Sequence, residues 1–292
     1  MFNHTTIDNR AKSSINNIDG YFIDANNDFN NEYLSLVLGS SKDLLRRYNS
    51  WYSINDKLYF FKDVLIFNEL FLSELVKEYN LRSVNYHLAS TNGEVGIISE
   101  SIKDKNKKYF DYDCFFELVN GSVPSSIGEI KQIFQNRISD SNGEELIREL
   151  FRLTAFDFFT SQTDRSEKNI IFELDKSGIR LAKLFDFGTS LQSSNNINDY
   201  SVYNSSFETL RFPTDNNVSY EHEYLFYLIN NNAEFYRYLC KSLDIDIHKV
   251  LKNTIEKYHL FVPNSDKKEL FKFFDTKKKI IENTLTLSKS YK

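Results

Sequence analysis

The chain has 292 residues, a formal net charge of −5 and a sequence pI of about 5.7. General nucleic-acid binders and membrane-surface binders carry a basic excess, so we expect no direct nucleic-acid binding. No apolar run approaches the roughly 20 residues that span a bilayer, and residues 1–14 lack the apolar centre of a signal peptide. The length suits one large domain or two small lobes.

Two groups of residues are interpreted as structural. Cys114 and Cys240 lie far apart in apolar, aromatic surroundings and form no CxxC motif, which predicts buried free thiols in a reducing cytoplasm. The basic run Lys277-Lys278-Lys279 lies among acidic residues on a predicted helix. Such a run is typical of a solvated helix face.

Short strands and one helix dominate the first third of the chain. Residues 1–17 are polar, and we expect them to be loose; residues 18–104 are predicted to form an N-terminal lobe. The Asn92-Gly93 pair predicts a two-residue hairpin. Apolar residues at helical spacing, from Ile66 to Leu75, predict a helix after the third strand. The expected strands cover residues 33–38, 50–54, 57–62, 84–89 and 94–99.

Residues 105–292 are predicted to form a larger helical lobe. A strong helical pattern covers residues 143–161, and a hairpin follows, with its turn at residues 175–178. Residues 188–219 are rich in Ser, Thr and Asn and indicate a long loop, after which we expect three helices. The predicted fold class is therefore α+β, with a small β-rich lobe and a larger helical lobe, the two-lobed arrangement of protein kinases.

The chemistry lies in the segments FDFFTSQTDRSEKNIIFEL, residues 156–174, and LAKLFDFGTSL, residues 181–191. Asp164 and Asn169 are separated by five positions after the helix, and Asp186 follows the hairpin. In phosphoryl transfer one carboxylate accepts the proton of the attacking hydroxyl, while an amide oxygen and a second carboxylate hold Mg²⁺. Each motif alone is common by chance, and both aspartates have an ordinary interpretation as turn residues. The order helix, DxxxxN, hairpin and DFG favours a phosphotransferase site.

An upstream lysine and glutamate fit the same chemistry. Lys62 ends a strand, and the helix that follows carries Glu69 and Glu74. A kinase binds the nucleotide phosphates with a strand lysine steadied by a helix glutamate, and we prefer Glu69 although the spacing does not exclude Glu74. Lys62 is equally compatible with an ordinary exposed strand-end residue.

The rest of the predicted nucleotide site is backbone. The loop Gly39-Ser40-Ser41 offers free N–H groups to phosphate, although a plain turn explains it equally well. Adenine is expected against the backbone from Glu100 to Ile102.

The run FDFFTSQTDRSEKNI followed by KLFDFGTSL resembles the HipA-like serine/threonine kinase family. It is also similar to the DRHxxN and DFG motifs of phosphatidylinositol 3/4-kinases. KLYFFK, NELFLSELVKEY and GEVGIISESI look like the family's N-lobe, so the resemblance spans residues 57–191. It implies a protein-kinase-like fold with Asp164 as catalytic aspartate, Asn169 and Asp186 as Mg²⁺ ligands and Lys62 as an ATP-binding residue. Asp157 matches an aspartate of that pattern, interpreted as support for the catalytic loop.

The sequence departs from the pattern at two positions. Ser166 stands where His is usual, and Gln162 where Gly or Asn is usual. The first departure puts catalytic efficiency in question more than the reaction class. Two alternatives therefore stay open: a lipid or small-molecule kinase, and a pseudokinase that acts by interaction.

The resemblance implies ATP and Mg²⁺ as cofactors and a protein substrate with a Ser/Thr acceptor. We expect a bacterial cytoplasmic protein. Two further alternatives stay open: that this protein is delivered as an effector, and that it binds a regulatory partner protein. We also expect autophosphorylation, because hydroxyls gather in two loops near cations that are able to pair with phosphate. The hydroxyls are those of Thr189, Ser190, Ser193, Ser194 and Ser201, and of Ser40 and Ser41; the cations are Arg46, Arg47 and Arg165.

Overall fold

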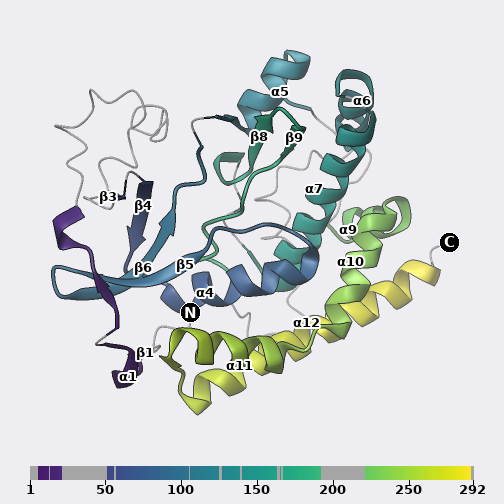
Figure 1. The fold of residues 1–292 in the computed structure, drawn as a ribbon. Helices are drawn as coiled ribbons and strands as arrows, with labels where there is room; N and C mark the ends of the chain where they lie inside the picture. The colour runs from purple at the N-terminus through teal and green to yellow at the C-terminus, as the bar shows by residue number, and fades with distance from the viewer. Residues whose placement is uncertain are drawn as a thin grey trace.

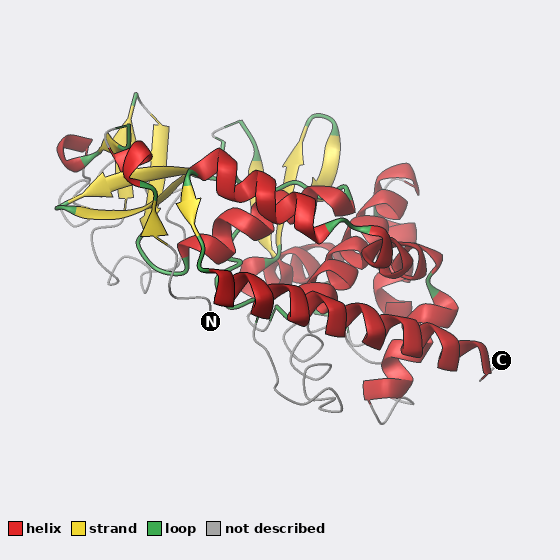
Figure 2. Ribbon diagram, turned by 90° about the horizontal axis from the view of Figure 1, so that it is seen from below, coloured by secondary structure: helices red, strands yellow, loops and turns green. Residues whose placement is uncertain are grey.

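The computed structural model describes residues 6–12, 14–21, 51–55, 57–104, 106–124, 127–138, 140–162, 165, 167–191 and 221–290. Figure 1 shows the strands of the first lobe on one side and the long helices of the second lobe on the other. The same separation appears from below in Figure 2. The predicted α+β class is confirmed.

The first lobe is built on a five-stranded sheet with the strand order β2-β5-β6-β4-β3. The predicted hairpin is present: Thr91 pairs with Glu94, and both Asn92 and Gly93 have positive φ, as a tight turn between twisted strands requires. The predicted strand at residues 33–38 lies outside the described residues. The strands are β2 Asn16–Asn17, β3 Trp51–Ile54, β4 Lys57–Lys62, β5 Tyr86–Thr91 and β6 Glu94–Glu100.

The second lobe holds seven helices in the described part of the chain: α5 Tyr112–Asn120, α6 Ile127–Arg137, α7 Asp140–Thr160, α9 Glu221–Asn231, α10 Ala233–Asp244, α11 Ile247–Tyr258 and α12 Asn264–Ser290. A three-stranded sheet, β7 Lys108–Asp111, β8 Ile171–Asp175 and β9 Gly178–Leu181, packs beside them. The β8–β9 hairpin confirms the hairpin predicted from the sequence. No helix among the described residues is long and apolar enough to cross a membrane.

Helix α4, Ile66–Leu75, lies between the sheet and the C-terminal helices, and the 3₁₀ turn Val76–Tyr79 extends it. Eight of its ten residues are buried, and Leu70 and Phe71 are completely enclosed. The ring of Phe71 meets that of Phe274 on α12 edge-to-face, with centroids 6.0 Å apart. The helix that follows Lys62 is therefore part of the main hydrophobic core of the molecule.

Two expectations about the ends of the chain are wrong. Most of residues 6–17 are ordered rather than loose: β1, Thr6–Ile7, pairs with β10, Leu260–Phe261, α1 covers Asn9–Lys12, and β2 joins the sheet beside β5. Four helices, not three, follow residue 220, because α9 and α10 are divided only by Asn232. No Gly or Pro marks that break.

Two side chains differ from expectation in their burial. Lys277, on α12, is buried, although a solvated helix face was predicted for it. Its side chain lies on the core side of the helix, and its amine is 4.8 Å from the centre of the Phe158 ring. Cys114 is exposed rather than buried, because it lies on the outer side of the first turn of α5.

Candidate active site

Three charged side chains meet where the two lobes join. Lys62, the last residue of β4, donates to Glu69 Oε1 at 2.5 Å and to Asp186 Oδ1 at 3.0 Å. The Glu69 side chain is fully buried, whereas that of Asp186 is 39% exposed. Lys62 therefore links a carboxylate fixed in the core to one that faces solvent.

Both oxygens of the buried Glu69 carboxylate accept hydrogen bonds. Besides Lys62, it accepts from the Tyr86 hydroxyl at 2.7 Å and from the backbone N–H of Phe187 at 3.0 Å, both at Oε2. A buried charge is stable only when it is paired and hydrogen-bonded, and here the donors come from β4, β5 and the segment after β9. Glu69 thus connects α4 to both lobes.

Glu74, the other candidate partner of Lys62, lies elsewhere. It pairs with Lys77 and Lys257, and it accepts a hydrogen bond from Tyr258. Glu74 therefore fastens α4 to α11 and takes no part in the Lys62 cluster.

The cluster keeps Lys62 charged. Burial opposes the charge of its ammonium, but the carboxylates of Glu69 and Asp186 outweigh burial and raise the pKa of Lys62 above its usual value. Burial, and then the charge of Glu69, raises the pKa of Tyr86 well above its usual value, so its hydroxyl remains a donor.

The segment from Asp186 to Ser190 is held by side chains of α4. Asn68, fully buried, donates to the carbonyls of Gly188 at 2.9 Å and Ser190 at 3.1 Å. A Cβ on Gly188 would lie 3.1 Å from Lys62 Nζ and 3.2 Å from Glu69 Oε1. The glycine thus leaves the space that the ion pair needs.

Asp164 lies outside the described residues, but residues on either side of it contact the segment of Asp186. Gln162 donates to the Asp186 carbonyl at 2.9 Å, and Arg165 donates to the Phe185 carbonyl at 3.1 Å. Arg165 also binds both carboxylate oxygens of Asp157, at 3.1 and 3.3 Å. Arg165 is therefore a buried structural residue, and the expectation that it pairs with phosphate is wrong; Asp157 holds it in place.

Asn169 and Asp186 lie beyond the same end of the β8–β9 hairpin. Asn169 ends the 3₁₀ turn Glu167–Asn169 just before β8 and is half-buried. The β8–β9 pairing continues to a hydrogen bond from the Ala182 N–H to the Ile171 carbonyl at 2.7 Å. The chain before β8 and the chain after β9 therefore lie at the same end of the hairpin. The hairpin returns the chain toward the turn that carries Asn169.

The remaining predicted site residues divide into two groups. Glu100 ends β6, exposed and paired with Lys57 at 2.9 Å, and Ile102 is half-buried against the core. The N–H of Ser101 between them is bonded to the Leu58 carbonyl at 2.8 Å. The hydroxyl-bearing loop and its cations, Gly39, Ser40, Ser41, Arg46 and Arg47, lie outside the described residues.

The sequence reasoning did not identify Asn68 and Tyr86. Asn68 had a detectable signal, because a polar residue among the mostly apolar residues of this helix must find a hydrogen-bond partner if it is buried. Tyr86 had none, since aromatic residues are common in strands.

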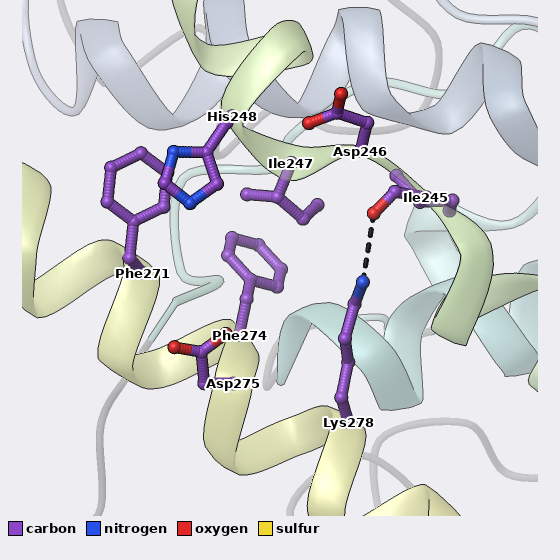
Figure 3. Close-up of a pocket in the computed structure, with 8 residues that line it drawn as sticks. All are labelled: Ile245, Asp246, Ile247, His248, Phe271, Phe274, Asp275 and Lys278. Carbon is purple, nitrogen blue, oxygen red and sulfur yellow. Dashed lines mark hydrogen bonds between the residues drawn. The ribbon is translucent and has the colours of Figure 1, made fainter.

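A separate cavity of about 120 Å³ lies between α11 and α12 (Figure 3). It shares no lining residue with the Lys62 cluster. Lys278 turns its ammonium to the Ile245 carbonyl at 3.0 Å, and His248 stacks on Phe271 with centroids 3.7 Å apart. Its eight lining residues are Ile245, Asp246, Ile247, His248, Phe271, Phe274, Asp275 and Lys278.

A β-rich lobe with one helix, a helical lobe and a Lys–Glu–Asp cluster at their junction are the features of the protein-kinase-like fold. A crystal structure of the proinflammatory kinase CtkA from Helicobacter pylori is similar, with a TM-score of 0.56 at 15% identity, over 82% of this chain and 94% of that one. This likeness confirms the predicted kinase-like fold. A chain of the Shewanella oneidensis complex of HipA, HipB and operator DNA gives a TM-score of 0.49 at 12% identity, over 80% of this chain and 59% of that one. No family model matches the sequence, and neither does any curated protein.

Proposed function

We propose that this chain is an ATP- and Mg²⁺-dependent kinase that transfers the γ-phosphate to a Ser or Thr hydroxyl of a protein. The observation that carries the proposal is the cluster of Lys62, Glu69 and Asp186. Phosphoryl transfer depends on positioning and charge more than on covalent chemistry, and this cluster fixes a cation and an exposed carboxylate side by side.

The donor set fits the cofactors. Asp186 Oδ2 makes no hydrogen bond within the described part of the chain, and carboxylate and amide oxygens are the ligands that Mg²⁺ prefers. Asp186 and Asn169 would hold the metal, and Lys62 would bind the phosphates. Mg·ATP, when bound, supplies the phosphoryl group and the cation that offsets its charge.

The other roles follow the sequence. Asp164 would orient the acceptor hydroxyl and accept its proton. The backbone of Glu100–Ile102 would face adenine, and the Gly39–Ser41 loop would face the phosphates. Cys114 and Cys240 are free thiols, which supports the cytoplasm as the working compartment. Effector delivery and a regulatory partner stay open within the proposal.

Autophosphorylation is part of the proposal, and the structure favours Thr189 over Ser190 among the described hydroxyls. Ser190 is completely buried, whereas Thr189 is half-buried. A buried hydroxyl cannot reach a phosphate without unfolding its segment.

Two variants test the division of labour. Asp164→Ala should abolish transfer of label from ATP yet leave ATP affinity nearly unchanged, because Asp164 acts on the acceptor. Asp186→Ala should also lose the Mg²⁺-dependent part of ATP binding in calorimetry. Wild-type ATP affinity that is equal in Mg²⁺ and in EDTA would refute the assigned roles.

The labelled product separates the remaining alternatives. Label in protein, located by intact mass and peptide mapping, supports the Ser/Thr kinase and reports autophosphorylation. Label in lipid or in a small molecule identifies the same fold with another acceptor. Metal-dependent ATP binding without any transfer identifies a pseudokinase.

A further inference from the structure

Gln162 occupies the turn between α7 and the catalytic loop, and it is completely buried. Its backbone N–H donates to the Asp157 carbonyl at 3.0 Å. The preceding residue, Ser161, has a φ of 50°, in the left-handed region, which turns the chain sharply out of α7. The backbone of Gln162 is therefore fixed, and so is the reach of its side chain.

The side-chain amide of Gln162 bridges two points of the segment after β9. Its Nε2 donates to the Asp186 carbonyl at 2.9 Å, and its Oε1 accepts from the Thr189 hydroxyl at 2.5 Å. A carbonyl only accepts, so the NH₂ group must face Asp186, and the amide oxygen must then face Thr189. The two partners together define one orientation of the amide.

Asp186 needs such support. Its φ of 58° lies in the left-handed region, which is uncommon for residues other than glycine, although Asp adopts it more readily than most; at a functional site such a conformation is held by its surroundings. The bond from Gln162 holds the carbonyl of the same residue whose carboxylate meets Lys62. The rotation of the Asp186 backbone, and hence the direction of its carboxylate, is thereby fixed from the catalytic-loop side.

We infer that Gln162 is a positioning residue for Asp186, and that the Thr189 hydroxyl sets the orientation of its amide. The inference rests on the proposed function, in which the Asp186 carboxylate holds Mg²⁺. Gln162, one of the two departures from the HipA-like pattern, then has a role that a Gly at this position cannot perform. Thr189 influences Asp186 only indirectly, by orienting the Gln162 amide.

The test uses variants that change donors with little change of volume. Gln162→Glu keeps the length of the side chain but removes the N–H donor to Asp186. Thr189→Val removes the hydroxyl, and Thr189→Ser restores it. Thr254→Val is the matched control, since Thr254 is buried on α11 and donates only to its own helix, to the Val250 carbonyl at 2.9 Å.

Calorimetry of ATP binding at increasing Mg²⁺ gives the decisive readout, with thermal unfolding of the free protein beside it. In Gln162→Glu the Mg²⁺ concentration for half-maximal ATP binding should rise about tenfold, the change expected when one hydrogen bond stops positioning a ligand. Thr189→Val should show a rise of about threefold to tenfold by the same mechanism. Thr189→Ser should lie within about twofold of wild type, and Thr254→Val should lower the unfolding temperature without changing the Mg²⁺ dependence.

The outcomes separate this inference from the proposed function. If wild-type protein shows no Mg²⁺-dependent ATP binding, the proposed function itself fails. If wild type shows it, and Thr189→Val and Gln162→Glu keep the wild-type Mg²⁺ dependence, Gln162 is only structural and the inference is overturned. An equal shift in Thr254→Val would overturn it as well. Should Gln162→Glu not fold, the Thr189 pair decides alone.

Discussion

The carboxylate of Glu69 accepts a hydrogen bond from the backbone N–H of Phe187 at 3.0 Å. The two residues come from different lobes, and Phe187 directly follows the Asp186 that meets Lys62. One buried carboxylate therefore fixes the lysine and, at the same time, the chain beside the exposed aspartate.

We expect Glu69→Gln to reduce phosphotransfer by roughly 10- to 100-fold, because hydrogen bonds to charged groups contribute about 1.5–3 kcal/mol. An amide has no charge to hold Lys62, and one of its two polar atoms cannot accept. The loss should appear in the KM for ATP as well as in kcat, measured by steady-state kinetics.

Glu74→Gln is the matched control. Glu74 lies on the same helix but pairs with Lys77 and Lys257 at a partly exposed site, where such pairs contribute about 0–1 kcal/mol. Its activity should stay near wild type. Equal losses in the two variants would mean that the Lys62–Glu69 pair has no special part in the reaction.

Gly188→Ala should weaken ATP binding. The added methyl group would lie 2.8 Å from Leu65 Cδ1 and 3.1 Å from Lys62 Nζ, so the lysine must move or the segment must shift. Overpacking of this kind costs about 1–3 kcal/mol.

Calorimetry with Mg·ATP measures the effect, and Gly20→Ala is the comparison, because nothing lies within 4 Å of a Cβ at Gly20. Unchanged affinity in Gly188→Ala would show that the Lys62 pair tolerates displacement.

Lys277→Met should stabilise the protein at neutral pH. Burial lowers the pKa of Lys277 from 10.5 to about 7. Between these two values the unfolded chain binds a proton that the folded chain does not, so wild-type stability rises as pH increases from 7 to 10. Methionine has no charge to lose on burial. The free energy of unfolding of Lys277→Met should therefore exceed that of wild type by about 2–4 kcal/mol at pH 7, and the difference should shrink toward pH 10.

Lys278→Met should have the opposite effect at neutral pH. Lys278 donates to the carbonyls of Leu243 at 2.7 Å and Ile245 at 3.0 Å, at the end of α10. Leaving these acceptors unpaired costs about 1–3 kcal/mol. Urea unfolding of both variants at several pH values measures the contrast. A Lys277→Met protein that is less stable than wild type at pH 7 would show that the buried amine is better accommodated than its surroundings suggest.

Local patterns predicted the elements around the site. The Asn92-Gly93 turn fixes the β5–β6 hairpin through its two positive φ angles, and the β8–β9 hairpin follows from alternating apolar residues around a turn. These features depend on neighbours in the sequence, which is why a single sequence reveals them. The order of the motifs then indicated which side chains would meet.

The features that the sequence could not predict depend on packing between residues far apart in the chain. β1 is a two-residue strand of ordinary composition, and only its partner β10 makes it a strand. Lys277 is buried because α12 turns that position toward Phe158, while its neighbour Lys279 is exposed. The choice between Glu69 and Glu74 likewise depends on which face of α4 meets β4 and which meets α11.

The enclosure of α4 bears on how the protein is made. A ribosome releases β4 and α4 long before it releases α11 and α12, which cover the outer side of α4 through contacts such as Phe71 with Phe274. Until those helices emerge, the apolar side chains of α4 lack their cover, and Glu69 lacks a fixed frame in which to hold Lys62. The nascent chain is thus expected to stay inactive, and to depend on chaperones, until α12 is synthesised.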